Sequence, residues 1–79
     1  MKITILKHPK KFMQKLTKKD QQRIVTAILE IPEGDIVPFR SRGSAYRLRI
    51  GDWRIVYDVI GNYEEIIIRK IGNRGDIYK

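Results

Sequence analysis

The sequence predicts a small α+β domain with the element order βααβββ, in which two N-terminal helices pack on one face of a small antiparallel sheet. A short apolar run opens the chain, and two segments with the apolar spacing of helices follow it. The second half then alternates apolar and polar side chains between glycine-containing turns, as hairpin strands do. Because the 79 residues show no repeat and no linker, we expect a single domain over residues 1–79.

The N-terminal part is expected to hold one strand and both helices. Residues 2–6, KITIL, predict the first strand, and Pro9 suits the first turn of a helix because an N–H is not needed there. Thr17, three residues before Asp20, resembles a capping signal for the second helix, which Pro32 is expected to end. The apolar positions at helical spacing are predicted to be core: Phe12, Met13, Leu16, Ile24, Ala27, Ile28 and Ile31.

The C-terminal part predicts a β-meander after a loop. Residues 32–43 are rich in proline, glycine and charge, and we interpret them as that loop. Gly51-Asp52 and Gly61-Asn62 are expected to form two-residue hairpin turns. The strands are predicted at residues 44–50, 53–60 and 63–71, with a short further piece at 76–78.

Charge restricts the class of partner. The chain holds 17 Lys and Arg against nine Asp and Glu, which gives a formal net charge of +8 at pH 7. In a domain of this size such an excess indicates a polyanionic partner, which is a nucleic acid, an acidic protein or an anionic membrane surface. The membrane is the weakest of the three, because no helix combines a basic face with bulky aromatic insertion residues.

Composition argues against several classes of protein. Without cysteine, neither a disulfide framework nor a thiolate metal site is available, and a single histidine argues against a zinc or haem site. We therefore expect no metal and no cofactor. No apolar run reaches the length of a signal-peptide core or of a membrane span, so a cytoplasmic protein is expected.

The arginines gather on the predicted meander. Side chains alternate across a strand, so Arg47 and Arg49 point away from the predicted core, and the first two-residue turn sets Arg49 opposite Arg54 on that same face. A second two-residue turn would place Arg69 opposite Arg54 as well. Like charges directly opposite each other destabilise a sheet by up to about 1 kcal/mol, so we interpret the arginines as a surface for phosphate groups. The alternative is an exposed sheet face that is basic without binding a ligand.

Two motifs carry a resemblance to a known family. Residues 46–57 read Y-R-L-R-x-G-D-W-R-I-V-Y, and residues 72–78 read G-x-R-x-x-I-Y. At this spacing, and with a strand and a helical pair before them, they resemble the RelE/ParE superfamily of bacterial toxins, and within it the RelE-like branch. The resemblance covers nearly the whole chain.

The resemblance implies an activity and partners. RelE-like proteins are toxins of type II toxin–antitoxin pairs, and they act as ribosome-dependent mRNA endoribonucleases, also called mRNA interferases. This chain is therefore expected to cleave mRNA in the 30S A site, in contact with rRNA, and to inhibit translation until a cognate antitoxin protein neutralises it. The implied reaction needs no metal: the ribose 2′-OH attacks the adjacent phosphate, and the 5′-oxygen leaves.

The resemblance also implies site residues at the matching motif positions. The catalytic set is expected to be Arg47, Arg49, Arg54, Arg74 and Tyr78. The residues Arg42, Arg69, Lys70 and Lys79 are also expected to bind RNA. The best-known family member has lysines on the strand at 44–50, one of them proposed as general base, whereas arginine is a poor proton acceptor. Either electrostatics and positioning suffice for cleavage here, or Tyr78 or the ribosome supplies the base.

Two other functions fit the same sequence. A ParE-like toxin would share the fold and poison DNA gyrase without cleaving RNA, although such relatives lack the matched arginine–tyrosine set. A non-catalytic basic module would bind RNA or DNA with strong salt dependence and would be harmless when expressed alone. Gyrase-linked DNA breaks would identify the first, and growth after induction would identify the second.

Overall fold

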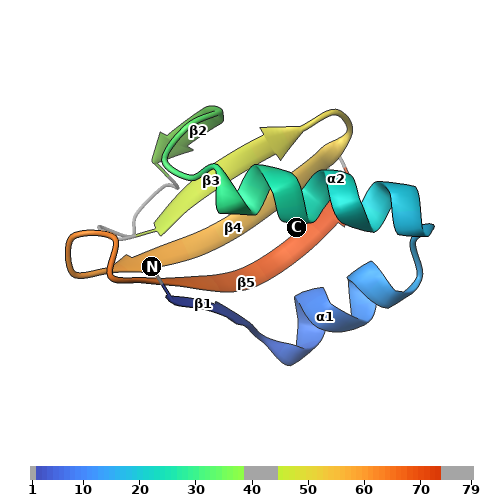
Figure 1. Cartoon of the computed structure of the whole chain (residues 1–79), viewed down its shortest axis with the longest axis horizontal. Coiled ribbons are helices and arrows are strands. Elements are labelled where there is room, and N and C mark those ends of the chain that lie inside the picture. Colours follow the sequence, from blue (N-terminus) through green and yellow to red (C-terminus); the bar gives the residue numbers. More distant parts are fainter. Residues whose placement is uncertain (1, 39–44, 74–79) are drawn as a thin grey trace.

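The computed structural model describes residues 2–38 and 45–73, and its elements are shown in Figure 1. In chain order they are β1 (Lys2–Ile5), α1 (Lys7–Gln14), α2 (Lys18–Leu29), β2 (Asp35–Pro38), β3 (Ala45–Ile50), β4 (Trp53–Ile60) and β5 (Glu65–Asn73). The predicted α+β class is confirmed, with the two helices ahead of an antiparallel meander. The short piece predicted at 76–78 lies outside the described residues.

The sheet differs from the prediction in its first strand. Its strand order is β1-β5-β4-β3-β2, and β1 pairs with β5 in the parallel sense while the other neighbours are antiparallel. The sheet is therefore mixed and not purely antiparallel. In the sequence, the two helices stand between β1 and the meander, and they carry the chain back along the sheet. This crossover lets β1 lie beside β5 and run in the same direction. Figure 1 shows β1 next to β5 at one edge of the sheet.

A second difference is β2, which falls in the segment predicted to be a loop. It pairs antiparallel with β3, beginning with Asp35 opposite Arg49. Pro38 is tolerated because β2 is the edge strand, where one side of the backbone needs no partner in the ladder. The prediction missed this strand because the nearby prolines and glycine favour a loop, although the β-branched pair Ile36-Val37 is typical of a strand.

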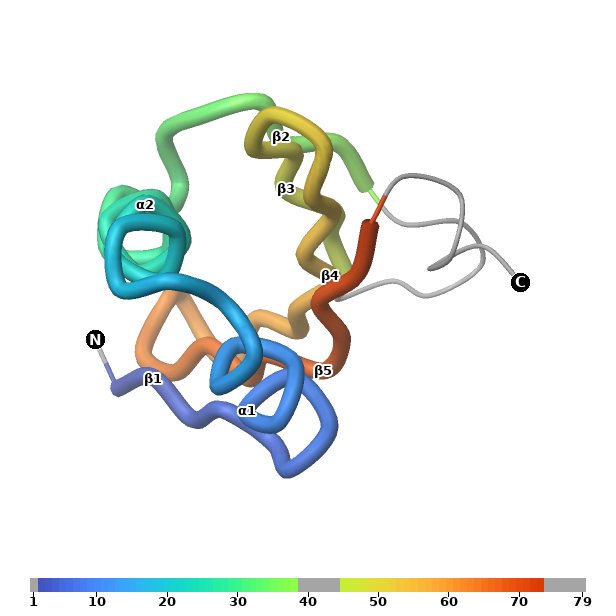
Figure 2. The backbone as a smooth tube through the Cα atoms, turned by 90° about the vertical axis from the view of Figure 1, so that its right-hand side faces the viewer, coloured from blue at the N-terminus to red at the C-terminus, as the bar shows by residue number. Residues whose placement is uncertain are grey.

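The helices cover one face of the sheet and close the core there. The helix α2 crosses the strands in Figure 1 and lies inside the curve of the sheet in Figure 2, while α1 contacts β5. Buried side chains from α2, from its C-terminal end and from the strands form the core: Ile24, Ile28, Ile31, Leu48, Ile55, Tyr57, Ile66, Ile68 and Ile71. The other predicted core positions are partly buried against it: Phe12, Met13, Leu16 and Ala27. The face of the sheet away from α2 is called the outer face below.

Local signals position α2. The Thr17 hydroxyl accepts a hydrogen bond from the backbone N–H of Asp20 at 3.2 Å, which confirms the predicted cap. The Gln21 side chain donates to the carbonyl oxygens of Met13 at 2.8 Å and Leu16 at 3.2 Å. These two bonds tie the start of α2 to the end of α1, so the helices reach the sheet as one unit.

Candidate nucleic-acid interface

The three arginines that the sequence places on one face do share it. The strands β3 and β4 pair with Arg49 opposite Arg54 and Leu48 opposite Ile55, which is the predicted register. Because Leu48 and Ile55 belong to the core, Arg47, Arg49 and Arg54 lie on the outer face. The hairpin therefore presents its guanidinium groups away from the helices.

These arginines differ in exposure. Arg49 is exposed, Arg47 is half-buried, and Arg54 is only 6% exposed. Arg54 Nη1 donates to the carbonyl oxygen of Trp53 at 3.4 Å, and its buried Nε has no acceptor within residues 2–38 and 45–73. A buried N–H without an acceptor costs free energy, so the position of Arg54 is unfavourable for the stability of the fold. The face is thus less uniformly exposed than the sequence implies.

The predicted place of Arg69 opposite Arg54 is wrong. The β4–β5 connection is a loop over residues 61–64 and not a two-residue turn, and Arg69 is the extra residue of a bulge on β5. The longer loop and the bulge together shift the register, so that Gly72 lies opposite Arg54. Arg69 Nε instead donates to the carboxylate of Asp58 in an ion pair across β4 and β5.

Lys70 joins the arginines on the outer face. It is exposed and lies opposite Val56, whose neighbour on the other side is Arg47. A row made of Arg47, Val56 and Lys70 therefore runs beside the pair Arg49–Arg54. The remaining predicted site residues lie outside the described residues: Arg42, Arg74, Tyr78 and Lys79.

Two acidic residues of the outer face were not predicted as part of the site. Asp35, on β2, is exposed and lies opposite Arg49. Asp58 is 7% exposed and pairs with Arg69. The β-branched pair that follows Asp35 is the signal that could have located it, by predicting β2. The structure therefore places one carboxylate, that of Asp35, next to Arg49 on the arginine face.

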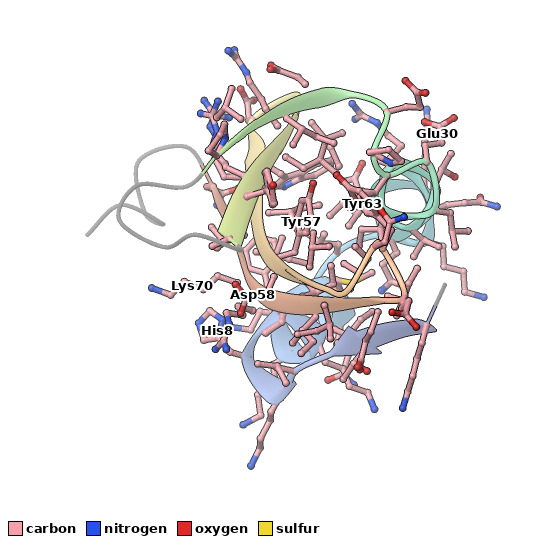
Figure 3. The ribbon with its side chains drawn as sticks, turned by 90° about the vertical axis from the view of Figure 1, so that its left-hand side faces the viewer. His8, Glu30, Tyr57, Asp58, Tyr63 and Lys70 are labelled. Carbon is pink, nitrogen blue, oxygen red and sulfur yellow. The ribbon has the colours of Figure 1, made fainter. Side chains whose placement is uncertain are left out.

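The tyrosines of the hairpin pack on the core face. Tyr57 is 1% exposed, and its ring stacks with that of Tyr46, with centroids 5.8 Å apart and 23° between the planes. Burial, reinforced by Tyr63 and Tyr46, raises the pKa of Tyr57 to about 12. Figure 3 shows Tyr57 between the strands and α2, with Asp58 and Lys70 on the other side of the strands. Tyr57 therefore stays protonated near neutral pH and does not stack on RNA bases.

We expect Tyr57 to make the fold sensitive to alkali. Its pKa is about 12 in the folded chain against an ordinary value of 10.0, so folding stabilises the protonated form. This stabilisation is complete below about pH 10 and is lost as the pH rises toward 12. Urea unfolding should show that Tyr57→Phe loses less stability than wild type over this range. An equal decline in the two proteins would contradict this expectation.

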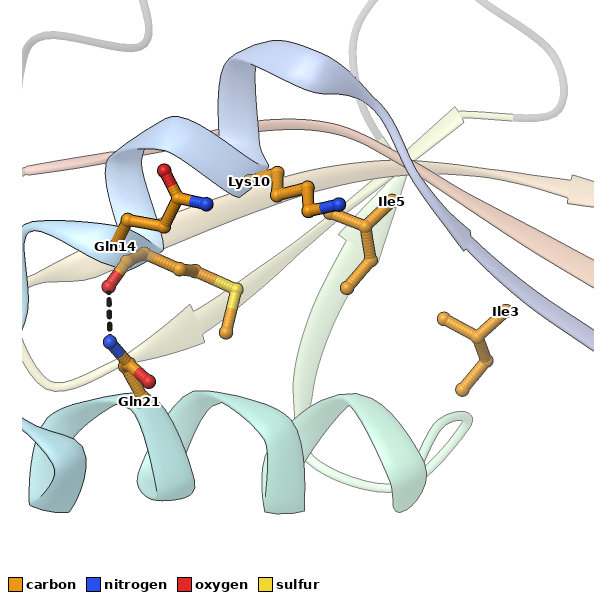
Figure 4. Close-up of a pocket in the computed structure, with 6 residues that line it drawn as sticks. Ile3, Ile5, Lys10, Gln14 and Gln21 are labelled. Carbon is orange, nitrogen blue, oxygen red and sulfur yellow. Dashed lines mark hydrogen bonds between the residues drawn. The ribbon is translucent and has the colours of Figure 1, made fainter.

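An apolar groove opens beside the edge strand β1. Its volume is about 440 Å³, and side chains from β1, α1 and α2 line it: Ile3, Ile5, Lys10, Met13, Gln14 and Gln21. Figure 4 shows the two isoleucines on one side, Lys10 above them, and the hydrogen bond from Gln21 to the Met13 carbonyl at one end. The groove thus combines apolar walls with a positive charge.

Neither a metal centre nor a membrane span is found in the described part of the chain. Within residues 2–38 and 45–73, no three His, Cys, Asp or Glu side chains are grouped so that they could hold a metal ion. No helix there is long and apolar enough to cross a membrane.

Several solved structures share this fold over nearly the whole chain. The archaeal RelE–RelB complex from Pyrococcus horikoshii contains a chain that is 30% identical, with 95% of this chain and 96% of that chain covered and a TM-score of 0.76. The RelB–RelE complex from Methanococcus jannaschii gives 26% identity, 95% and 94% coverage, and a TM-score of 0.76. The isolated RelE toxin of E. coli shares the fold at 18% identity, 98% and 89% coverage, and a TM-score of 0.75. No family model and no curated protein matches the sequence.

Sequence and fold point to the same family. The identity of 30% extends over almost all of both chains, so it is more than a shared arrangement of strands and helices. The motif at residues 46–57 occupies β3, its turn and the start of β4, which is the hairpin that carries the arginines. This chain therefore belongs to the RelE-like toxin superfamily.

Proposed function

We propose that this chain is the toxin of a type II toxin–antitoxin pair and acts as a ribosome-dependent endoribonuclease on mRNA. The observation that supports this most is the cross-strand pair Arg49–Arg54, with Arg47 on the same face. The similar structures are RelE toxins, solved with RelB or alone. Because RNA cleavage concentrates negative charge on one phosphate, a fixed group of guanidiniums is the chemistry that the reaction calls for.

The reaction is an internal transesterification. The ribose 2′-oxygen attacks the adjacent phosphorus and the bond to the 5′-oxygen breaks, which leaves a 2′,3′-cyclic phosphate and a 5′-hydroxyl. Arg54, whose buried Nε lacks an acceptor in the described part of the chain, stabilises the charge that develops on the phosphate. Arg47 and Arg49 hold phosphates of the codon. Two further residues are carried over from the family motif: Arg74 acts at the leaving oxygen, and Tyr78 orients a nucleobase.

The ribosome orders the substrate for this face. An open sheet surface positions RNA only if the strand is already held in one conformation, and the A site holds the codon in that way. Free RNA is therefore cleaved poorly. The exposed side chains of Arg49 and Lys70 contact phosphates of mRNA and rRNA, whereas Arg69 contributes less because Asp58 neutralises it. Such a protein acts in the cytoplasm, where the ribosomes are.

A cognate antitoxin is the protein partner, and the groove beside β1 is its docking site. The apolar walls, formed by Ile3, Ile5 and Met13, accept apolar side chains. Lys10 lies at the groove, and residues 1–19 hold seven lysines and no acidic residue, so carboxylates are favoured around it. The segment that binds there is therefore acidic and amphipathic, and it folds on the toxin as it binds.

Ribosomes programmed with a defined mRNA test the proposal. The protein should cut the A-site codon and leave a 5′-hydroxyl and a cyclic phosphate, which primer extension and end-group analysis detect. The same RNA without ribosomes should stay largely intact, and the cognate antitoxin should stop the cleavage. An intact message on the ribosome would overturn the proposal. DNA breaks at gyrase would then favour a ParE-like toxin, and salt-dependent binding alone would favour a non-catalytic module.

A further inference from the structure

The proposed reaction needs an acceptor for the 2′-OH proton, and the arginines do not provide one. A guanidinium stays protonated in proteins, so Arg47, Arg49 and Arg54 bind phosphate without taking a proton. Tyr57 is buried on the core face, and its pKa of about 12 keeps it protonated. His8 lies at the start of α1, next to β5, and β4 separates β5 from Arg49 on β3. Lys70 is exposed on the outer face, but a lysine ammonium donates protons and has no acceptor, so it binds phosphate as the arginines do. The carboxylates of the outer face are acceptors of the required kind.

Three carboxylates lie on the described part of the outer face, and two of them are engaged. Asp58 is buried and pairs with Arg69. Glu65, at the start of β5, accepts a hydrogen bond from the Thr4 hydroxyl at 2.9 Å. Asp35 is exposed, and within residues 2–38 and 45–73 its carboxylate takes part in no ion pair or hydrogen bond. It is therefore the carboxylate that a substrate can reach.

Asp35 continues the arginine pair across the sheet. It lies opposite Arg49 on β3, which lies opposite Arg54 on β4, so the three side chains project from the same face. Neighbouring strands are about 4.8 Å apart, which places Asp35 roughly 10 Å from the Arg54 backbone, with Arg49 between them. A phosphate held by the two arginines would bring its own ribose within reach of the carboxylate.

We propose that Asp35 is the general base of this toxin, an inference that rests on the proposed function. As the 2′-oxygen forms its bond to phosphorus, the 2′-OH proton passes to a carboxylate oxygen of Asp35. The bond from phosphorus to the 5′-oxygen breaks, and that oxygen leaves with the electron pair and takes a proton from water. Asp35 then gives its proton to the hydroxide that remains, so both the protein and the solvent are restored.

The variants Asp35→Asn and Asp35→Ser test this role, because neither side chain takes up a proton as a carboxylate does. In single-turnover cleavage on programmed ribosomes, the rate at saturating toxin is expected to fall by about 10²-fold, with the half-saturating concentration unchanged. Asp35→Glu should recover part of the rate. Asp52→Asn removes an equal charge from the turn between β3 and β4 and should cleave like wild type. Thermal unfolding midpoints verify that each variant is folded.

The alternative role for Asp35 is to relieve the repulsion between Arg49 and Arg54. This role predicts the opposite change in cleavage rate on substitution of Asp35. Asp35→Asn would then bind programmed ribosomes more tightly and cleave at least as fast as wild type. That result would overturn the assignment of the base and leave the proposed nuclease in place. Absence of cleavage by the wild-type protein would instead overturn the proposed function, so the wild-type rate distinguishes the two failures.

Discussion

Replacing Arg54 with alanine is expected to lower the rate of mRNA cleavage on programmed ribosomes by about 10²–10³-fold, as removal of one preorganised donor from a site of developing charge does. Arg54 is only 6% exposed, so water screens its charge less than that of the exposed Arg49. The Arg54 guanidinium makes no ion pair within residues 2–38 and 45–73, so its charge is not neutralised there. Cleavage at saturating toxin, followed by primer extension, measures the loss.

Arg23→Ala is the matched control, because it removes the same charge from the helix side of the molecule. Arg23 lies on α2, where it pairs with Asp20 at 3.9 Å and lies over the Trp53 ring at 5.1 Å. Its removal should leave cleavage near the wild-type rate. If Arg23→Ala lost as much activity as Arg54→Ala, net charge alone would account for the effect, and the assignment of Arg54 would be wrong.

Ile55→Ala is expected to lower the free energy of unfolding by about 2–5 kcal/mol, the range for large-to-small substitutions in cores. Ile55 is 0% exposed and lies between Leu48 on β3 and Ile71 on β5, under α2. Small domains hold only about 5–15 kcal/mol in total, so this loss is a large fraction of the stability. Urea unfolding followed by circular dichroism measures it.

Ile60→Ala removes the same atoms from the end of the same strand and serves as the control. Ile60 is 46% exposed, so its truncation leaves no buried cavity. The free energy of unfolding should change by about 0.5 kcal/mol or less. Similar losses for Ile55→Ala and Ile60→Ala would contradict the position of the core between α2 and the sheet.

The hairpin that carries the arginines could be predicted because its determinants are local. The turn at Gly51-Asp52 decides which residues of β3 and β4 face each other, and Gly51 adopts a φ of +55°, which glycine accommodates without steric cost. Alternation along the strands then assigns Arg47, Arg49 and Arg54 to one face. The cap of α2 was predictable for the same reason, since its donor and acceptor lie three residues apart.

The partner of Arg69 could not be predicted in this way. One extra residue in β5 and a longer loop before it bring Gly72 opposite Arg54 and leave Arg69 beside Asp58. A bulge of this kind has no pattern of its own in the sequence, because it is the packing of the flanking isoleucines into the core that selects it. A shift of the register by one residue turns each side chain of the strand to the other face of the sheet. The prediction of a two-residue turn therefore placed Arg69 opposite Arg54, whereas in the structure Arg69 pairs with Asp58.

The sequence by itself determined the α+β class, the arginine hairpin and the resemblance to RelE-like toxins, whereas only the tertiary structure decided which strands flank that hairpin. At one edge β2 places Asp35 beside Arg49, and at the other β1 lies parallel to β5. These pairings join segments whose own residues give weak or ambiguous signals, and the burial of the whole sheet face under α2 selects them. For that reason the basic residues of the face were predictable from their neighbours in the chain, and the acidic residue beside them was not.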